Sequence, residues 1–140
     1  MNKSKVTFIL HKPQLSENIG ACARAIKNFD FQKLYLIDPK PIFPNDKILA
    51  TSVGAKDIIK KSKVFNNLES SLGNIDILIA TSARFRNKNV KHINLEGLKK
   101  IDFRKKLGFY LVQKHQVYQI KKLVMQITLY KFQQILILNL

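Results

Sequence analysis

An α/β fold with an open parallel sheet and flanking helices is predicted for residues 1–108 of this 140-residue chain. The first observation behind it is that short apolar segments alternate with helical ones, as in chains that form parallel sheets with helices on both faces. The second is that three of these segments are apolar enough to be buried on both faces, which is typical of parallel strands. Open α/β folds bind their ligands at the carboxyl edge of the sheet, so residues just after the strands are the candidates for chemistry.

The elements follow from hydrophobic periodicity and from turn residues. Four segments are expected to be strands: Val6–Leu10, Leu34–Ile37, Val64–Phe65 and Ile75–Ala80. Four are expected to be helical: Asn18 to about Phe29, Asn45–Ser52, Asp57–Lys61 and Leu68–Leu72. The last helix has Asn66 three residues before Glu69, which is similar to a capping box, and Gly73 as its stop signal.

The charge is strongly unbalanced. The chain has 25 Lys and Arg residues against 9 Asp and Glu, a formal net charge of +16. This favours nucleic acid or another anionic surface as the partner and says little about the fold.

Cysteine content and apolar runs exclude several classes of protein. Cys22 is the only cysteine, which excludes a disulfide framework and a cysteine-based zinc site, and no metal is expected. It lies on the expected buried side of a helix, where a structural thiol is favoured over a nucleophile. The apolar run after Lys3 and Lys5 is too short for a secretory signal, and no run is long enough to cross a bilayer. A cytoplasmic protein without a membrane segment is therefore expected.

The most informative segment is Asn18-Ile19-Gly20-Ala21-Cys22-Ala23-Arg24, which follows the first expected strand. Free N–H groups at a helix start, beside a fixed cation such as Arg24, favour a phosphate-bearing partner. The alternative is an ordinary helix in which Asn18 is the N-cap, Gly20 allows close packing and Arg24 is solvated. The residues alone leave both interpretations open.

A second polar segment, Ile79–Arg86, begins at the end of the last strong strand. The hydroxyls of Thr81 and Ser82, with the adjacent N–H groups, could bind a small polar ligand at the sheet edge. Arg84 and Arg86 flank Phe85, so the two cations could pair with phosphates while the ring stacks on a base. The alternative is a polar loop with two solvated arginines.

Taken in order and spacing, these segments and Ser52-Val53-Gly54-Ala55 resemble the SPOUT superfamily of RNA methyltransferases. The resemblance is to the SpoU branch, which methylates ribose 2′-hydroxyls of tRNA, and it covers Val6 to about Gly108. It implies that Asn18 and Arg24 are catalytic and that Thr81, Ser82 and Ala83 contact S-adenosyl-L-methionine. The implied partners are tRNA or rRNA and a second copy of the chain, a homodimer joined largely through a C-terminal knot.

The resemblance leaves two roles open for Arg24. It implies that the arginine helps to activate the ribose hydroxyl, which is a poor nucleophile. A guanidinium stays protonated at neutral pH, so it is a very weak base unless a desolvated pocket and a substrate phosphate assist. Arg24 therefore either activates the hydroxyl or only positions the phosphate.

Residues 109–140 break the resemblance. They contain six Gln and no Gly, Pro, Ala, Ser, Asp, Glu or Arg. The family implies a Gly-Pro-Glu segment, a Gly-Leu-Ser-Asn segment and a Ser-Leu-Asn-Leu helix start here, which tie the knot and build most of the methyl-donor pocket. A shifted reading frame permits these missing segments. Each shifted codon joins the third base of one residue's codon to the first two bases of the next. From Leu111 to Gln126 this frame permits Gly-Pro-Glu-Thr-Ser-Gly-Leu-Ser-Asn-Lys-Glu-Ile-Ser-Asn-Ala.

This reading predicts a one-base frameshift near Gly108 or Phe109. Residues 1–108 are then the N-terminal part of the methyltransferase and residues 109–140 an out-of-frame tail, whose composition is helix-compatible. The last strands and the knot are expected to be absent, which leaves a sheet edge exposed and impairs activity. The alternative function is a non-catalytic, basic RNA-binding remnant that uses Arg24, Arg84 and Arg86. A small module that caps a partner enzyme has little support.

Overall fold

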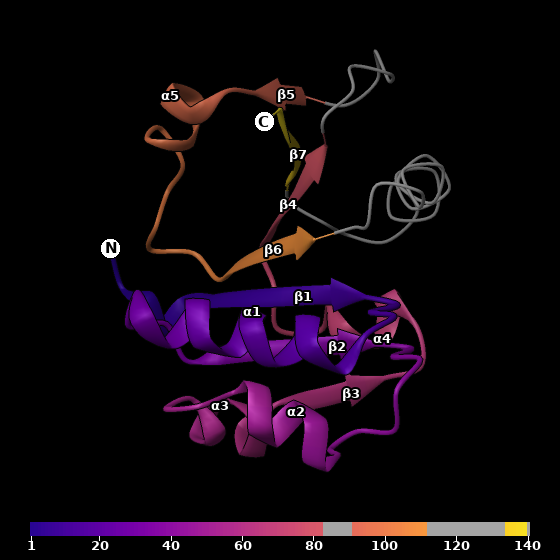
Figure 1. Ribbon diagram of the computed structural model, residues 1–140. Helices are drawn as coiled ribbons and strands as arrows, with labels where there is room; N and C mark the ends of the chain where they lie inside the picture. Colours follow the sequence, from indigo (N-terminus) through magenta and orange to yellow (C-terminus); the bar gives the residue numbers. More distant parts are fainter. Residues whose placement is uncertain (83–90, 112–133, 140) are drawn as a thin grey trace.

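The computed structural model describes residues 1–82, 91–111 and 134–139, which form one parallel sheet with helices on both faces (Figure 1). A short 3₁₀ helix, η1 (Lys3–Lys5), leads into the first strand. The strands are β1 (Val6–His11), β2 (Lys33–Ile37), β3 (Lys63–Phe65), β4 (Ile77–Ser82), β5 (Lys91–Ile93), β6 (Leu107–Leu111) and β7 (Gln134–Asn139). The helices are α1 (Ser16–Asn28), α2 (Asp46–Thr51), α3 (Lys56–Lys61), α4 (Leu68–Ser71) and α5 (Leu95–Leu98).

The sheet has the strand order β3-β2-β1-β6-β4-β7-β5, and every pairing is parallel. Strand β6 lies between β1 and β4, and its register aligns Ile9, Tyr110 and Ala80 in one row across the three strands. All strands therefore end at the same edge of the sheet. The predicted fold class, an open parallel α/β sheet with flanking helices, is confirmed.

One face of the sheet is covered by α1, α2 and α3. Helix α1 buries Ile19, Ala23 and Ile26, which recur at four- and three-residue intervals and so form a single apolar stripe. This stripe packs in one cluster with Leu34 and Leu36 of β2. Burying each such aliphatic side chain contributes roughly 1.5–3 kcal/mol, so the stripe fixes α1 against the sheet.

The opposite face carries α4, which is a single turn. Leu68 and Leu72 from this turn pack with Ile9 and Leu78 from the sheet and with the fully buried ring of Tyr110. Because α4 is so short, part of this face near the amino ends of β1, β2 and β3 carries polar and charged side chains in place of a helix.

Two helix starts differ from the predicted ones. Helix α1 begins at Ser16, with Leu15 as an N-cap residue that provides no side-chain acceptor, so Asn18 is the third helical residue and not the cap. Helix α4 is capped by Asn67, whose side chain accepts a hydrogen bond from the N–H of Ser70 at 2.9 Å, and not by Asn66. In both cases the residue that reaches extended backbone at the helix entry is one that the sequence pattern did not single out.

Cys22 is half-buried on α1, and burial raises the pKa of its thiol to about 11. The thiol is therefore protonated at neutral pH. The predicted structural role is confirmed, because a nucleophilic cysteine needs the thiolate.

The expectation that no strand follows β6 is wrong. Strand β7 pairs with β4 from Ile77–Gln134 to Ser82–Asn139, and with β5 on its other side, so the edge of β4 is covered. The residues concerned are Gln-Ile-Leu-Ile-Leu-Asn, an aliphatic run that suits an inner strand of a parallel sheet better than a helix. Residues 112–133, where the family would have its knot and where this chain is expected to lack it, lie outside the described part of the chain.

Candidate functional site

The carboxyl edge of the sheet brings together the ends of β1, β6 and β4. Because Ile9, Tyr110 and Ala80 form one row, the next residues along the strands, Leu10, Leu111 and Thr81, reach the edge side by side. The Thr81 hydroxyl donates a hydrogen bond to the carbonyl oxygen of Tyr110 at 3.4 Å, which ties β4 to β6 at this point. Helix α1 starts from the same edge, after a loop of four residues that follows β1.

The loop between β1 and α1 is held in one conformation. Lys12 has a φ of 49°, and its N–H donates to the carbonyl oxygen of Ile37 at 2.8 Å. Asp38, at the end of β2, has a φ of 45°, and its carboxylate pairs with the Lys12 ammonium at 3.5 Å. The N–H of Lys40 donates to the carbonyl oxygen of Pro13 at 3.0 Å. These contacts fix where the chain turns from β1 into α1, and so fix the start of the helix.

Asn18 and Arg24 both lie on the exposed side of α1. They are six residues apart, which is about 9 Å along the axis of an α-helix. Arg24 has no ion pair with any carboxylate in residues 1–82, 91–111 or 134–139, so its guanidinium faces solvent. Glu17 is the one acidic residue in the first turn, and its charge is compensated by the Lys47 ammonium at 2.6 Å.

Gly20 sets the distance between α1 and α2. A Cβ added at Gly20 would lie 2.0 Å from the Thr51 hydroxyl oxygen and 2.9 Å from the Thr51 backbone carbonyl carbon. The Thr51 hydroxyl is itself bonded to the carbonyl oxygens of Lys47 and Ile48, at 2.8 and 3.2 Å. This close approach agrees with the interpretation in which Gly20 allows close packing. The segment from Asn18 to Arg24 therefore has a structural role and is also a candidate site.

Two residues that sequence reasoning did not single out, His11 and Tyr110, lie under this edge. His11 Nδ1 is hydrogen-bonded to the Tyr110 hydroxyl, whose ring is fully buried. Burial and then the nearby charge of Glu69 raise the pKa of Tyr110 well above its usual value. Both side chains are therefore uncharged at neutral pH. The signal in the sequence is a histidine at a strand end and a tyrosine inside an apolar strand, but only the strand order shows that they meet.

The pKa of His11 predicts a dependence of stability on pH. Burial, and after it the charge of Lys12, lowers this pKa from its usual 6.5, although Asp38 and Glu69 act in the opposite direction. His11 therefore binds a proton more readily in the unfolded chain than in the folded chain. Its contribution to the free energy of unfolding is fully present above about pH 6.5 and is lost as the pH falls toward the pKa of the folded state. We expect the melting temperature to fall more between about pH 7.5 and pH 5.5 in the wild type than in His11→Gln, whose amide does not titrate. Equal falls in the two proteins contradict this assignment.

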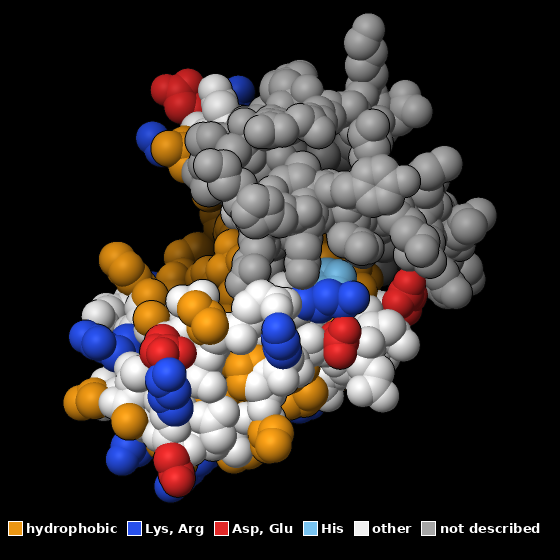
Figure 2. Space-filling model, turned by 45° about the vertical axis from the view of Figure 1, so that its right-hand side comes forward, with side chains coloured by type: hydrophobic (Ala, Val, Ile, Leu, Met, Phe, Trp, Pro, Cys, Tyr) orange, Lys and Arg blue, Asp and Glu red, His pale blue; other side chains and the backbone are white. Residues whose placement is uncertain are grey.

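Two elements that carry predicted site residues meet at the same edge of the sheet. One is α1, which starts at this edge and carries Asn18 and Arg24, and the other is β4, which ends there with Thr81 and Ser82. Ala83, Arg84 and Arg86 lie outside the described residues. Where Figure 2 shows described residues, Lys and Arg side chains are spread among acidic and apolar ones and form no single dense basic patch.

The described residues do not by themselves complete a pocket for S-adenosylmethionine. The Thr81 hydroxyl is used to bridge β4 and β6, and the Tyr110 hydroxyl is buried against His11. A donor molecule with an amino acid and a nucleoside moiety needs several converging polar groups. No group of three His, Cys, Asp or Glu side chains that could hold a metal ion occurs in residues 1–82, 91–111 and 134–139.

An open parallel α/β sheet with flanking helices is a fold that methylases of the SpoU class share with many other α/β proteins. The chain belongs to the SpoU rRNA methylase family, whose model matches residues 5–126. Among the described residues, no helix has both the length and the apolar character needed to span a membrane.

Curated relatives match about 60% of the chain. The tRNA (cytidine-2′-O-)-methyltransferase TrmJ of Methanocaldococcus jannaschii is 34% identical over 89 residues, which is 63% of this chain and 38% of that protein. The Uncharacterized tRNA/rRNA methyltransferase LasT of Escherichia coli K12 is 41% identical over 85 residues, 60% of this chain and 36% of that protein. The matched region thus spans little more than a third of the length of either relative.

Solved structures agree in fold. A probable methylase family protein from Haemophilus influenzae Rd KW20 superimposes with a TM-score of 0.81 at 22% identity, over 100% of this chain and 56% of that one. TrmJ from Z. mobilis ZM4 superimposes with a TM-score of 0.75 at 21% identity, over 95% and 57% of the two chains. At these identities the likeness concerns the fold alone.

Proposed function

We propose that the chain derives from an enzyme that transfers a methyl group from S-adenosyl-L-methionine to a ribose 2′-hydroxyl of tRNA. One observation carries the proposal: the helix with Asn18 and Arg24 and the strand that ends in Thr81 and Ser82 meet the same edge of a SpoU-family sheet. Names of the relatives support tRNA as the substrate, since they describe tRNA 2′-O-methyltransferases.

Arg24 is the residue we assign to the RNA. It is exposed, it has no carboxylate partner among the described residues, and it lies on a helix that is fixed at both its start and its packing face. A guanidinium binds a phosphate through two parallel hydrogen bonds, which would hold the ribose next to it in place. Asn18 precedes it on the exposed side of α1, and Arg84 and Arg86 are proposed to add phosphate contacts.

We further propose that methyl transfer by the 140-residue chain is impaired. The resemblance implies that residues 109–140 supply most of the donor pocket, and these residues lack the Gly, Ser and Glu residues that it implies there. A frameshift explains this lack, because the shifted reading restores a Gly-Pro-Glu and a Gly-Leu-Ser-Asn segment. The homodimer implied by the resemblance depends on the same region, so we expect dimerisation to be weakened too.

A second candidate function is RNA binding without catalysis. The net charge of +16 and the solvent-facing Arg24 favour it, since neither depends on a donor pocket. The two candidates differ in one measurable property, the binding of S-adenosylmethionine.

The test compares two proteins made from the same gene. One is the 140-residue chain, and the other carries a one-base insertion before the codon for Leu111, which restores the shifted reading. Both are measured by calorimetry with S-adenosylmethionine and by transfer of a labelled methyl group to tRNA. We expect both to bind tRNA and only the restored chain to bind the donor and label the RNA. Donor binding by the unrestored chain contradicts the proposed impairment, and a restored chain that binds no donor contradicts the proposed enzyme.

A further inference from the structure

A groove lined by lysines lies at the edge of the sheet opposite to the candidate site. It has a volume of about 520 Å³, and half of the ten residues that line it are lysines: Lys5, Lys33, Lys61, Lys63 and Lys106. The other lining residues are uncharged, and none carries a carboxylate. The groove therefore concentrates positive charge, in contrast to the mixed surface seen in Figure 2.

The fold itself gathers these lysines. Lys33 and Lys63 are the first residues of β2 and β3, Lys5 precedes β1, and Lys106 precedes β6. In a parallel sheet the amino ends of neighbouring strands meet at one edge, so residues far apart in sequence line one groove. The register places Thr7 beside Lys33 and Tyr35 beside Lys63, on the face that the short helix α4 leaves uncovered.

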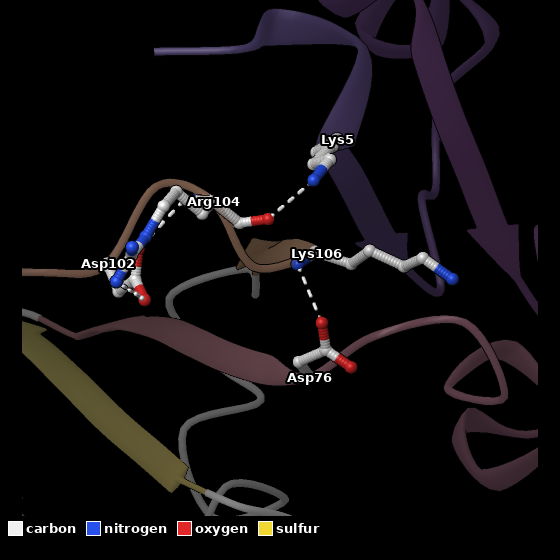
Figure 3. A network of polar contacts seen from close by, with 5 residues as sticks. All are labelled: Lys5, Asp76, Asp102, Arg104 and Lys106. Carbon is white, nitrogen blue, oxygen red and sulfur yellow. Dashed lines mark hydrogen bonds and ion pairs between the residues drawn. The ribbon is translucent and has the colours of Figure 1, made fainter.

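Nearby contacts hold the loop that carries Lys106 in place and leave its ammonium group available. The backbone N–H of Lys106 donates to the Asp76 carboxylate at 2.8 Å, and its side chain extends away from that carboxylate (Figure 3). Lys5 Nζ donates to the carbonyl oxygen of Arg104 at 2.6 Å. Asp102 compensates the charge of Arg104 at 2.9 Å, and this contact lowers the pKa of the carboxyl to about 2.

The groove lysines differ in their charge balance from four lysines elsewhere in the chain. Lys3, Lys12, Lys27 and Lys47 each pair with a carboxylate within 3.5 Å. Within residues 1–82, 91–111 and 134–139, none of the five groove lysines forms such a pair. Like charges held in one groove repel each other, so an anion that bridges them is stabilised.

We propose that this lysine groove binds the phosphate backbone of RNA, as a second contact surface distinct from the carboxyl edge. A row of phosphates suits charges that are spread over the starts of four strands better than one small anion does. The Tyr35 ring is packed against Phe65, with a centroid distance of 5.0 Å, and lies 6.0 Å from the Lys63 ammonium. The Tyr35 ring is therefore not free to stack on a base. The groove is expected to bind the phosphates of RNA without specificity for the base sequence.

The proposal rests on the proposed function only in taking RNA as the polyanion. It requires neither methyl transfer nor a complete donor pocket. A failure of donor binding therefore leaves it standing, and the experiment below can overturn it while the enzyme proposal stands.

The test uses the 140-residue chain and two matched triple variants. The groove variant is Lys33→Gln with Lys61→Gln and Lys63→Gln, and the control variant is Lys56→Gln with Lys99→Gln and Lys100→Gln, three exposed lysines outside the groove. Binding of a labelled oligouridylate of about 20 nucleotides is measured between about 50 and 300 mM salt, where counterion release governs affinity. Circular dichroism checks that both variants are folded.

The groove variant is expected to bind about tenfold more weakly, and its plot of log affinity against log salt is expected to be shallower by about 2, or 0.7 for each lost phosphate contact. The control variant is expected to keep the wild-type slope. Equal changes in the two variants, or none in the groove variant, overturn the proposal. Binding of the wild type to phosphatidylserine vesicles, with no groove-dependent binding of RNA, overturns it in favour of a membrane surface.

A readout that needs no variant is the protection of lysines in the wild type. Lys33, Lys61, Lys63 and Lys106 are expected to be acetylated more slowly when the oligouridylate is present, and Lys56, Lys99 and Lys100 at an unchanged rate. Uniform protection of both sets contradicts a defined groove.

Discussion

Gly20→Ala is expected to destabilise the protein by about 2 kcal/mol or more, because the new methyl group has no room. The added Cβ would lie 2.0 Å from the Thr51 hydroxyl oxygen and 2.9 Å from the Thr51 carbonyl carbon. The hydroxyl is held by two carbonyl oxygens of α2, so it cannot simply rotate away, and the backbone of α2 must move. The change is measured as the free energy of unfolding in urea.

Gly73→Ala is the matched control for this substitution. A Cβ at Gly73 meets nothing within 4 Å, so the same chemical change is expected to alter stability by less than about 1 kcal/mol. A Gly20→Ala protein as stable as the Gly73→Ala protein would show that α1 and α2 do not pack as described. Position 20 thus links stability to the site, because the packing of α1 on α2 also sets where Asn18 and Arg24 lie.

The second large effect is expected at Arg24. In the chain with the restored reading frame, Arg24→Ala is expected to lower kcat/KM for tRNA methylation by about a hundredfold or more, the scale seen when one charged or hydrogen-bonding group is removed from a transition state. The melting temperature should change little, because Arg24 is exposed and unpaired among the described residues. Methyl transfer is measured with labelled donor over a range of tRNA concentrations.

Two further variants separate charge from geometry. Arg24→Lys keeps the charge and loses the planar fork, so a partial recovery indicates that the charge contributes by itself, and a loss as large as that of alanine indicates that the parallel hydrogen bonds of the guanidinium are needed. Lys56→Ala removes an exposed cation from α3 and should leave the rate unchanged. An equal loss in Lys56→Ala and Arg24→Ala would reduce Arg24 to one charge among many.

Much of the N-terminal half could be predicted from the sequence, because its elements are marked by local patterns. The buried runs that became β1, β2 and β4 and the stripe Ile19, Ala23 and Ile26 of α1 are examples. The N-cap residues Leu15 and Asn67 were not predicted. Leu15 has no side-chain acceptor and so gives no capping signal, whereas Asn66 and Asn67 are equally able to cap.

The remaining features depend on pairings between distant segments. Strand β6 enters the sheet between β1 and β4, which is what brings Tyr110 to His11, and no local pattern encodes that neighbour relation. Strand β7 was expected to be absent, and it pairs with β4 and β5. The lysine groove is a property of the strand order in the same way, because its lysines come from four separate strand starts.

We propose that the edge shared by α1 and β4 belongs to a methyl-transferring site, and that the tail of this chain leaves this site incomplete. The most direct measurement is the transfer of labelled methyl groups from S-adenosylmethionine to tRNA by the 140-residue chain and by the chain with one base inserted before the codon for Leu111, assayed side by side. We expect ribose-linked label with the restored chain and background label with the other. Background label from a restored chain that is folded and binds tRNA would show that this edge is not a methyl-transferring site.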